Sequence, residues 1–181
     1  MSELYKKYFT FYEQFHQHKY NKLVHIACIP GIIWSFFGLV NHAVSKGIDL
    51  PNSVFIMPSN LIYIAYMIYY HKLGAPQKIL DKTVLFYALI LYNSSKFYLT
   101  TSKKYSLYIF AAVQVLSWVF QILSHKIIEK NSPALLSGIK QSFLTAPIFV
   151  IEELNRYIPN INFWYIAVFL GVILHFKIRV Y

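Results

Sequence analysis

The sequence is poor in cysteine and in charge. Cys28 is the single cysteine among 181 residues, which excludes an internal disulfide and a cysteine-based zinc site. Charged residues make up 13% of the chain and hydrophobic residues 57%, whereas roughly a quarter of the residues in an ordinary soluble domain are charged. Lipid is therefore the expected surrounding of much of the chain, and we expect one membrane domain without internal repeats.

Several widespread catalytic motifs are also missing. The chain has no G-x-S-x-G nucleophile elbow, no glycine-rich phosphate loop and no H-E-x-x-H motif, so serine-hydrolase and nucleotide chemistry have no support. Glu152 and Glu153 are the one pair of adjacent acids, and a helix-end cap beside Arg156 explains them. The net charge of +10 does not indicate nucleic acid, because the lysines are scattered and form no stripe. Lysines that flank membrane spans explain the excess.

Long apolar runs are present instead. Runs of about 18 or more apolar residues with few charges are typical of membrane-spanning helices. Polar segments that carry Gly, Pro and Asn separate these runs and mark chain reversals. We expect an all-α polytopic membrane helix bundle with five to six apolar helices, in a single domain over residues 1–181. The candidate spans are 23–43, 54–71, 79–98, 105–125, 133–154 and 161–176.

The fifth apolar segment, 133–154, is ambiguous. Lys140 and Gln141 fall near its middle, and Pro147 follows a few residues later. Charged groups at mid-bilayer are costly unless they face protein or water. A re-entrant hairpin broken at Pro147 therefore stays open beside a true span.

The orientation follows from the basic residues. Residues 1–22 lack an uninterrupted apolar core and a small-residue cleavage site, so we expect no signal peptide. They would form a cytoplasmic segment that leads into the membrane helices of 23–176. With six spans, most lysines and arginines fall on the side of the N-terminus, which predicts that the N-terminus is cytoplasmic.

With this topology, five histidines fall at the same depth of the membrane. His16, His18 and His25 lie before or just inside the first span, His71 ends the second, and His125 ends the fourth. All five would lie on the cytoplasmic side. Residues far apart in the sequence thus converge where a metal can be held between helix ends.

Polar residues accompany these histidines on the same helix faces. Residues four apart share a face of an α-helix, so Asn21 lies with His25, and Gln121 and Glu129 lie with His125. Such groups can act in catalysis by fixing the orientation of the imidazoles.

His16 and His25 constrain the backbone between them. They are nine residues apart, and on one straight helix they would point in opposite directions. Both can serve one site only if the chain bends near "HKYN" (18–21). A short helix followed by the first span would supply that bend.

The residue types do not determine which metal would bind. Neutral imidazole and carboxylate are the usual ligands of non-haem Fe(II), which tolerates open positions for oxygen and a substrate. Zinc accepts the same ligands. Histidines at a membrane interface also bond to headgroups, water or neighbouring helices without any metal.

Two blocks of the sequence resemble a known family. The first is "FYEQFHQHKYNKLVHIACIP" (11–30), whose pattern H-x-x-x-x-N-x-x-x-H-x-x-x-x-P is carried by His16, Asn21, His25 and Pro30. The second block (118–153) matches at Gln121, His125, Glu129, Pro133, Ala134, Leu135, Ala146, Pro147, Phe149 and Glu153. In both blocks the chain is similar to the 2-hydroxy fatty acid dioxygenase family of the endoplasmic reticulum membrane.

The resemblance implies an activity, a cofactor and a location. Members of the family are Fe2+-dependent dioxygenases that shorten 2-hydroxy fatty acids by one carbon, an α-oxidation, in phytosphingosine breakdown. It implies that His16, His25 and His125 bind Fe2+ and that O2 and a 2-hydroxy fatty acid are the substrates. The carboxylate and the 2-hydroxyl of that acid are expected to chelate the iron. The expected location is the endoplasmic reticulum membrane, with another organelle membrane, such as the mitochondrial inner membrane, as the alternative.

The sequence also departs from the family pattern. Gln17 follows His16, where many relatives have two adjacent histidines, and Ser124 precedes His125, where a glycine is frequent. A fourth metal ligand is therefore open. Its candidates are His18, Glu129 and His71.

Two other functions stay open. The chain can be a catalytically silent family member that serves as a structural or accessory subunit of a larger membrane protein complex. It can also be a zinc-dependent lipid hydrolase or hydroxylase, whose product would keep all its carbons.

Overall fold

The computed structural model describes residues 1–130 and 135–158, and over these residues it is all helical, as predicted. A one-turn 3-10 helix, η1 (Val54–Ile56), precedes α3, and a π-helical turn, η2 (His125–Glu129), follows α5. The sixth predicted span, 161–176, lies outside the described residues. The α-helices are α1 (Glu3–Gln14), α2 (Lys19–Val44), α3 (Pro58–Leu73), α4 (Gln77–Thr100), α5 (Lys103–Ser124) and α6 (Leu135–Tyr157).

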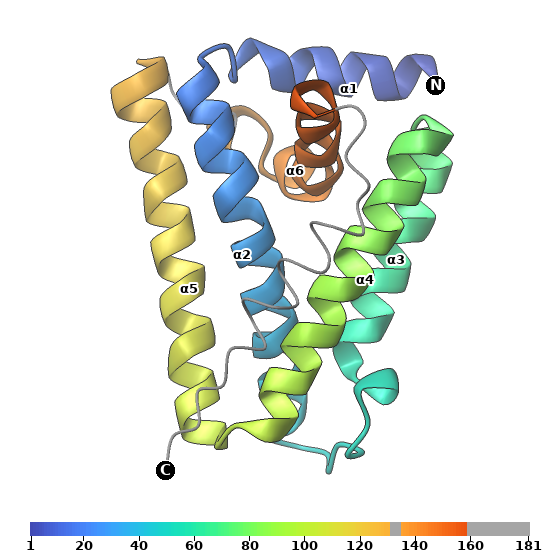
Figure 1. Cartoon of the computed structure of the whole chain (residues 1–181), viewed down its shortest axis with the longest axis vertical. Coiled ribbons are helices and arrows are strands. Elements are labelled where there is room, and N and C mark those ends of the chain that lie inside the picture. Colours follow the sequence, from blue (N-terminus) through green and yellow to red (C-terminus); the bar gives the residue numbers. More distant parts are fainter. Residues whose placement is uncertain (131–134, 159–181) are drawn as a thin grey trace.

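Four long helices form a bundle, and α1 lies across one end of it (Figure 1). Helices α2 and α5 pack side by side, and α3 and α4 form a second pair. Beneath α1, helix α6 packs against α2 and α4. Residues of α1, α2 and α6 therefore meet at the end of the bundle that α1 covers.

The N-terminus of α1 is anchored to the turn between α3 and α4. The Ser2 hydroxyl accepts a hydrogen bond from the Tyr5 amide (3.0 Å) and donates one to the Leu73 carbonyl (2.6 Å). The Ser2 amide donates to the Gly74 carbonyl (2.9 Å). Gly74 ends α3 with a φ of 73°, in the left-handed region that favours glycine, and a Cβ there would lie 2.6 Å from the Ser2 Cβ. These contacts hold α1 across the bundle end.

Small residues let α2 and α5 approach each other closely. A Cβ on Gly38 would lie 2.2 Å from the ring of Phe110, which is fully buried. A Cβ on Gly31 would lie 3.0 Å from the Ser117 hydroxyl. The close contact fixes how α2 and α5 lie relative to each other, and so how their ends at the α1 side meet.

Helix α6 continues through Pro147. A proline has no amide hydrogen, so the Phe143 carbonyl four residues earlier loses its helical partner. The Tyr66 hydroxyl donates to that carbonyl (3.4 Å), and the Tyr87 hydroxyl donates to the Pro147 carbonyl (3.0 Å). Tyrosines of α3 and α4 thus stabilise α6 at Pro147. The re-entrant hairpin considered from the sequence required a break at this proline, but α6 continues through it.

Two of the described helices are long and apolar enough to cross a membrane. They are α2 (Lys19–Val44) and the continuous helix formed by α5 and η2 (Lys103–Glu129). Helix α3 has 16 residues, whereas a span needs about 20, and α4 carries charged residues such as Asp81 and Lys82. Helices do form at 54–71 and 79–98, but five to six apolar membrane helices are not confirmed in the described part of the chain.

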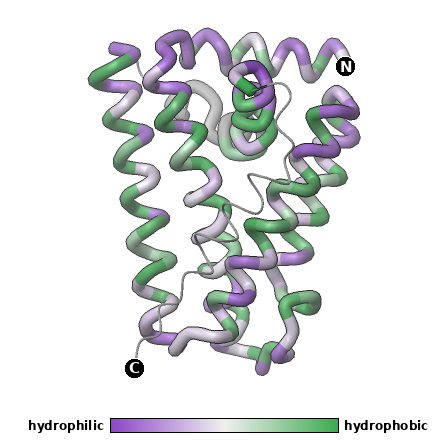
Figure 2. The backbone as a smooth tube through the Cα atoms, in the orientation of Figure 1, coloured by the Kyte–Doolittle hydropathy of each residue, from purple (hydrophilic) through white to green (hydrophobic). Residues whose placement is uncertain are grey.

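Helix α5 exposes much of its apolar surface. Only 22% of its most apolar stretch is buried, whereas the core helix of a soluble protein would be mostly buried. Figure 2 shows hydrophobic residues along α5 and more hydrophilic ones in α1. This exposed face indicates association with a membrane or another apolar surface. Its side chains are Leu107, Tyr108, Val115, Leu116, Val119, Phe120, Ile122 and Leu123.

Candidate metal centre

Three histidines meet at the end of the bundle that α1 covers. His16 follows α1, His25 lies in α2 and His125 begins η2. Each offers one ring nitrogen, and these three atoms all lie within 4.8 Å of one another. All three side chains are buried. No other group of three possible ligand side chains comes this close within the part of the chain that the structure describes.

The chain turns between α1 and α2, and this turn lets His16 approach His25. Helix α1 ends at Gln14 and α2 begins at Lys19, so the predicted bend and the short preceding helix are confirmed. His18 caps α2, because its exposed ring accepts a hydrogen bond from the Tyr20 amide (3.3 Å).

Backbone carbonyls set the protonation of two of the rings. Nδ1 of His16 lies 2.8 Å from the Tyr12 carbonyl oxygen, and Nδ1 of His25 lies 3.0 Å from that of Asn21. A carbonyl can only accept, so each Nδ1 carries the proton and donates it. Nε2 then keeps its lone pair, and Nε2 of His16 is buried without a hydrogen-bond partner among the described residues. On both rings Nε2 is therefore the nitrogen that can bind a metal.

His125 completes the group. Its Nε2 lies 3.2 Å from Nε2 of His25, and its Nδ1 is buried without a partner in the part of the chain that the structure describes. Three nitrogens bound at about 2.1 Å to one ion lie about 3.0–3.4 Å apart. The His25–His125 pair already has that spacing, and all three nitrogens lie within 4.8 Å of one another.

Burial keeps His16 neutral. The loss of water, followed by the nearby imidazole of His25, lowers the pKa of His16 to about 2. Neutral imidazole is the form that binds metals, so protons do not compete for this ring near pH 7.

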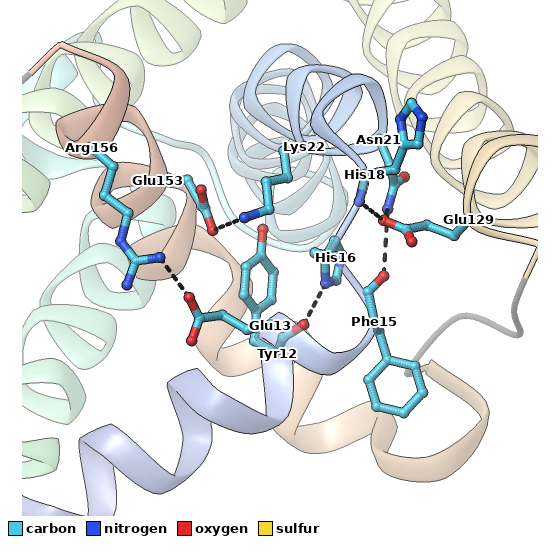
Figure 3. A network of polar contacts seen from close by, with 10 residues as sticks. All are labelled: Tyr12, Glu13, Phe15, His16, His18, Asn21, Lys22, Glu129, Glu153 and Arg156. Atoms are coloured by element: carbon cyan, nitrogen blue, oxygen red, sulfur yellow. Dashed lines mark hydrogen bonds and ion pairs between the residues drawn. The ribbon is translucent and has the colours of Figure 1, made fainter.

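Asn21 ties together the segments that carry the histidines (Figure 3). Its Nδ2 donates to the Glu129 carboxylate (3.1 Å) and to the Phe15 carbonyl (3.5 Å). Its Oδ1 accepts from the Ser124 hydroxyl (2.5 Å). Asn21 is fully buried, so it holds α2, the turn after α1 and the end of α5 at fixed positions around His25.

The predicted fourth ligands lie outside the group of three. The Glu129 carboxylate accepts from the His18 backbone amide (2.8 Å) as well as from Asn21, while the ring of His18 caps α2. His71 is exposed at the end of α3. Gln121 is buried one turn before the third histidine, and no described residue forms a hydrogen bond with its Nε2.

The π-helical turn explains where Glu129 goes. Turns of this kind contain one more residue than an α-helical turn and are frequent at functional sites. The Lys130 amide donates to the His125 carbonyl, and Lys130 has a φ of 53°. The turn rotates Glu129 away from its α-helical position, and its carboxylate bonds to Asn21.

Tyr12 and the Lys22–Glu153 ion pair were missed from the sequence. The Tyr12 ring stacks on the His16 ring, with centroids 3.9 Å apart and planes at 14°. The sequence indicated this contact only through the spacing of four residues, which places two side chains on one face of a helix. Lys22 pairs with Glu153 at 2.9 Å, a contact between α2 and α6.

The expected cap at the end of α6 was wrong. Arg156 pairs with Glu13 of α1 at 2.5 Å, and Glu152 accepts a short hydrogen bond from the Tyr5 hydroxyl. These acids and this arginine therefore fasten α6 to α1. Burial, reinforced by Glu152, raises the pKa of Tyr5, so its phenol keeps the proton that it donates.

Comparisons with known proteins assign the family. The family described as "2-hydroxy-palmitic acid dioxygenase Mpo1-like" matches residues 2–158, which include all three histidines. The chain belongs to the Mpo1-like family. This confirms the predicted membership. The 2-hydroxy-palmitic acid dioxygenase MPO1 of Saccharomyces cerevisiae is 24% identical over 144 residues, which cover 79% of this chain and 75% of that relative. No solved structure matches the chain.

Proposed function

We propose that this Mpo1-like protein is an Fe2+-dependent dioxygenase that shortens 2-hydroxy fatty acids by one carbon. The observation that carries the proposal is the convergence of three buried histidine nitrogens, from the turn after α1, from α2 and from η2, within 4.8 Å. Imidazole ligands suit iron, and a set of three leaves further positions for oxygen and for a substrate.

The residues present fit such an ion. Buried polar atoms nearly always have a partner, yet within residues 1–130 and 135–158 Nε2 of His16 and Nδ1 of His125 have none. A metal would bind His16 Nε2, His25 Nε2 and one nitrogen of His125. Hydrogen bonds from Nδ1 of His16 and His25 to backbone carbonyls orient these rings and raise the basicity of the opposite nitrogens.

Residues near the three histidines have supporting roles. Fe2+, when bound, supplies the electrons that activate O2. Asn21 and Glu129 hold the segments that carry the histidines, and Gln121 offers a buried amide beside them. Burial of the three rings keeps bulk water from the reacting groups.

The apolar helices support a membrane location. We propose that the protein is integral to the endoplasmic reticulum membrane, with its N-terminus and the histidines on the cytoplasmic side. The acyl tail of the substrate would remain in lipid beside α2 and α5, where each buried methylene contributes about 0.8 kcal/mol. The polar head of the acid then lies at the bundle end, at the depth of the histidines.

The proposed reaction balances with one molecule of oxygen. A 2-hydroxy acid, RCH(OH)COOH, and O2 give RCOOH, CO2 and H2O, and O2 accepts the four electrons that the carbons lose. The test is to load detergent-purified protein with Fe2+ anaerobically and then to supply 2-hydroxypalmitate and oxygen. Equal consumption of oxygen and formation of the acid one carbon shorter is the expected result. No oxygen uptake, or a zinc-loaded protein whose product keeps all its carbons, would refute the proposal.

The exposed face of α5 favours a second candidate. A contiguous apolar face can pack on a partner protein as well as on lipid, which suits an accessory subunit of a membrane complex. Copurification with a fixed set of membrane proteins, together with an absence of bound metal, would support this candidate over the enzyme.

A further inference from the structure

The hydroxyl of Tyr12 is a buried polar group without a partner. Tyr12 is 7% exposed, and none of the described residues forms a hydrogen bond with its oxygen. Buried polar groups nearly always have a hydrogen-bond partner, so the position of this hydroxyl calls for an explanation. The ring lies flat against His16, which places the hydroxyl next to the candidate metal centre.

A buried ion pair lies beside this hydroxyl. Figure 3 shows the Tyr12 oxygen next to the Lys22 ammonium and the Glu153 carboxylate. The side chain of Lys22 is 16% exposed and that of Glu153 is 2% exposed. The Glu153 carboxylate is close enough to Tyr12 to interact electrostatically with it. A phenol carries its proton near pH 7, so the Tyr12 hydroxyl can donate a hydrogen bond. Lys22 is also close enough to His16 to affect its charge.

The group offers more donors than it uses. An ammonium has three N–H donors, and the contact with Glu153 occupies one of them. Tyr12 adds an unused O–H. Two converging donors, one of them cationic, are complementary to an oxygen anion, and a hydrogen bond to a charged acceptor is about twice as strong as a neutral one.

We propose that Tyr12 and Lys22 bind the carboxylate of the fatty acid, with Glu153 holding Lys22 in place. The subsite would give the protein its preference for a free acid over a neutral ester of the same chain. It deepens the proposed function and rests on it for the identity of the acid. The three residues come from α1, α2 and α6, so the subsite exists only when α6 is packed against the other two helices.

The test is a binding measurement on the metal-free, full-length protein in detergent. The dissociation constants of 2-hydroxypalmitate and of its methyl ester are compared for the wild type and for Tyr12→Phe. The variant keeps the ring on His16 and loses only the donor. We expect its affinity for the acid to fall at least about tenfold while its affinity for the ester is unchanged.

Tyr70→Phe is the matched control. Tyr70 is likewise buried, and its hydroxyl has no hydrogen-bond partner among the residues that the structure describes, but it lies in the wall of an apolar cavity among α2, α3, α4 and α6. Both affinities should remain at the wild-type values in this variant. An equal loss of acid binding in Tyr70→Phe would attribute the effect to general loosening and overturn the proposal.

Lys22 needs a double variant, because Lys22→Met alone leaves Glu153 buried without a counter-charge. Lys22→Met combined with Glu153→Gln removes both charges and should abolish the preference for the acid. An unchanged ratio of acid to ester affinity in both Tyr12→Phe and the double variant would refute the subsite. Since no turnover is needed, a protein that selects the acid but consumes no oxygen would refute the dioxygenase and keep the subsite.

Discussion

Nε2 of His25 and Nε2 of His125 lie 3.2 Å apart, although 100 residues separate them in the chain. Both rings are buried, and Nδ1 of His25 already donates to a carbonyl. In the metal-free protein, the His125 N–H can donate to the lone pair of His25. The same two nitrogens have the spacing that a shared metal ion requires. The packing of α2 against α5 creates this juxtaposition.

Enlarging Gly38 should disturb that packing. In Gly38→Ala the new Cβ would collide with the Phe110 ring, and we expect the free energy of unfolding to fall by about 1–3 kcal/mol. Gly47→Ala is the control, because a Cβ there meets nothing within 4 Å. Unfolding of both variants in the same detergent checks this. Equal stability of the two would contradict the close approach of α2 and α5.

Asn21 should support both the fold and the metal site. Asn21→Ala removes the donor to Glu129 and the acceptor of Ser124, and we expect a loss of about 1–3 kcal/mol in stability. Metal affinity should fall about 10- to 100-fold, as is typical for groups that hold ligands in place. The control is Asn93→Ala, whose side chain donates to the Leu89 carbonyl of its own helix. Equal metal affinities in the two variants would show that Asn21 does not position the site.

The stability of the metal-free protein should depend on the charge of His16. Its pKa is about 2 in the folded chain and near the ordinary value of 6.5 in the unfolded chain. Between these values the unfolded chain binds more protons, so the free energy of unfolding rises with pH through this window. The buried neutral ring of His16 therefore costs no stability above pH 6.5, and the free energy of unfolding falls as the pH decreases from 6.5 toward 2.

Denaturation of metal-free protein at pH 7, 6 and 5 measures this dependence. His16→Gln, which cannot bind the proton, should lose less stability on acidification than the wild type. The same slope in both proteins would show that His16 is not buried as a neutral ring.

Local patterns in the sequence predicted much of the site. The bend before α2 and the shared face of Asn21 and His25 follow from helical periodicity and are present. The position of Glu129 does not follow, because a π-helical turn changes the periodicity just where it begins. His18 was a candidate for a fourth metal ligand, but its ring caps α2. A histidine can cap a helix, pack in the interior or bind a metal, and its spacing in the sequence does not show which of these it does.

Contacts made by α6 could not be predicted. Nothing in the residues around Glu153 indicates that α6 packs beneath α1, where this carboxylate meets Lys22. The helices at 54–71 and 79–98 were predicted at the right places, yet α3 is shorter than a membrane span and α4 contains charged residues. Apolar runs therefore located helices better than they identified membrane spans.

The metal content of the purified protein tests the central claim most directly. Detergent-purified protein, reconstituted with iron anaerobically, would be measured by elemental analysis beside His25→Ala, His125→Ala and His42→Ala. His42 is also buried, but it bonds to Ser106 and does not belong to the group of three. We expect about one iron per chain in the wild type and in His42→Ala, and none in the other two variants. No iron in the wild type, or equal iron in all four proteins, would contradict the central claim.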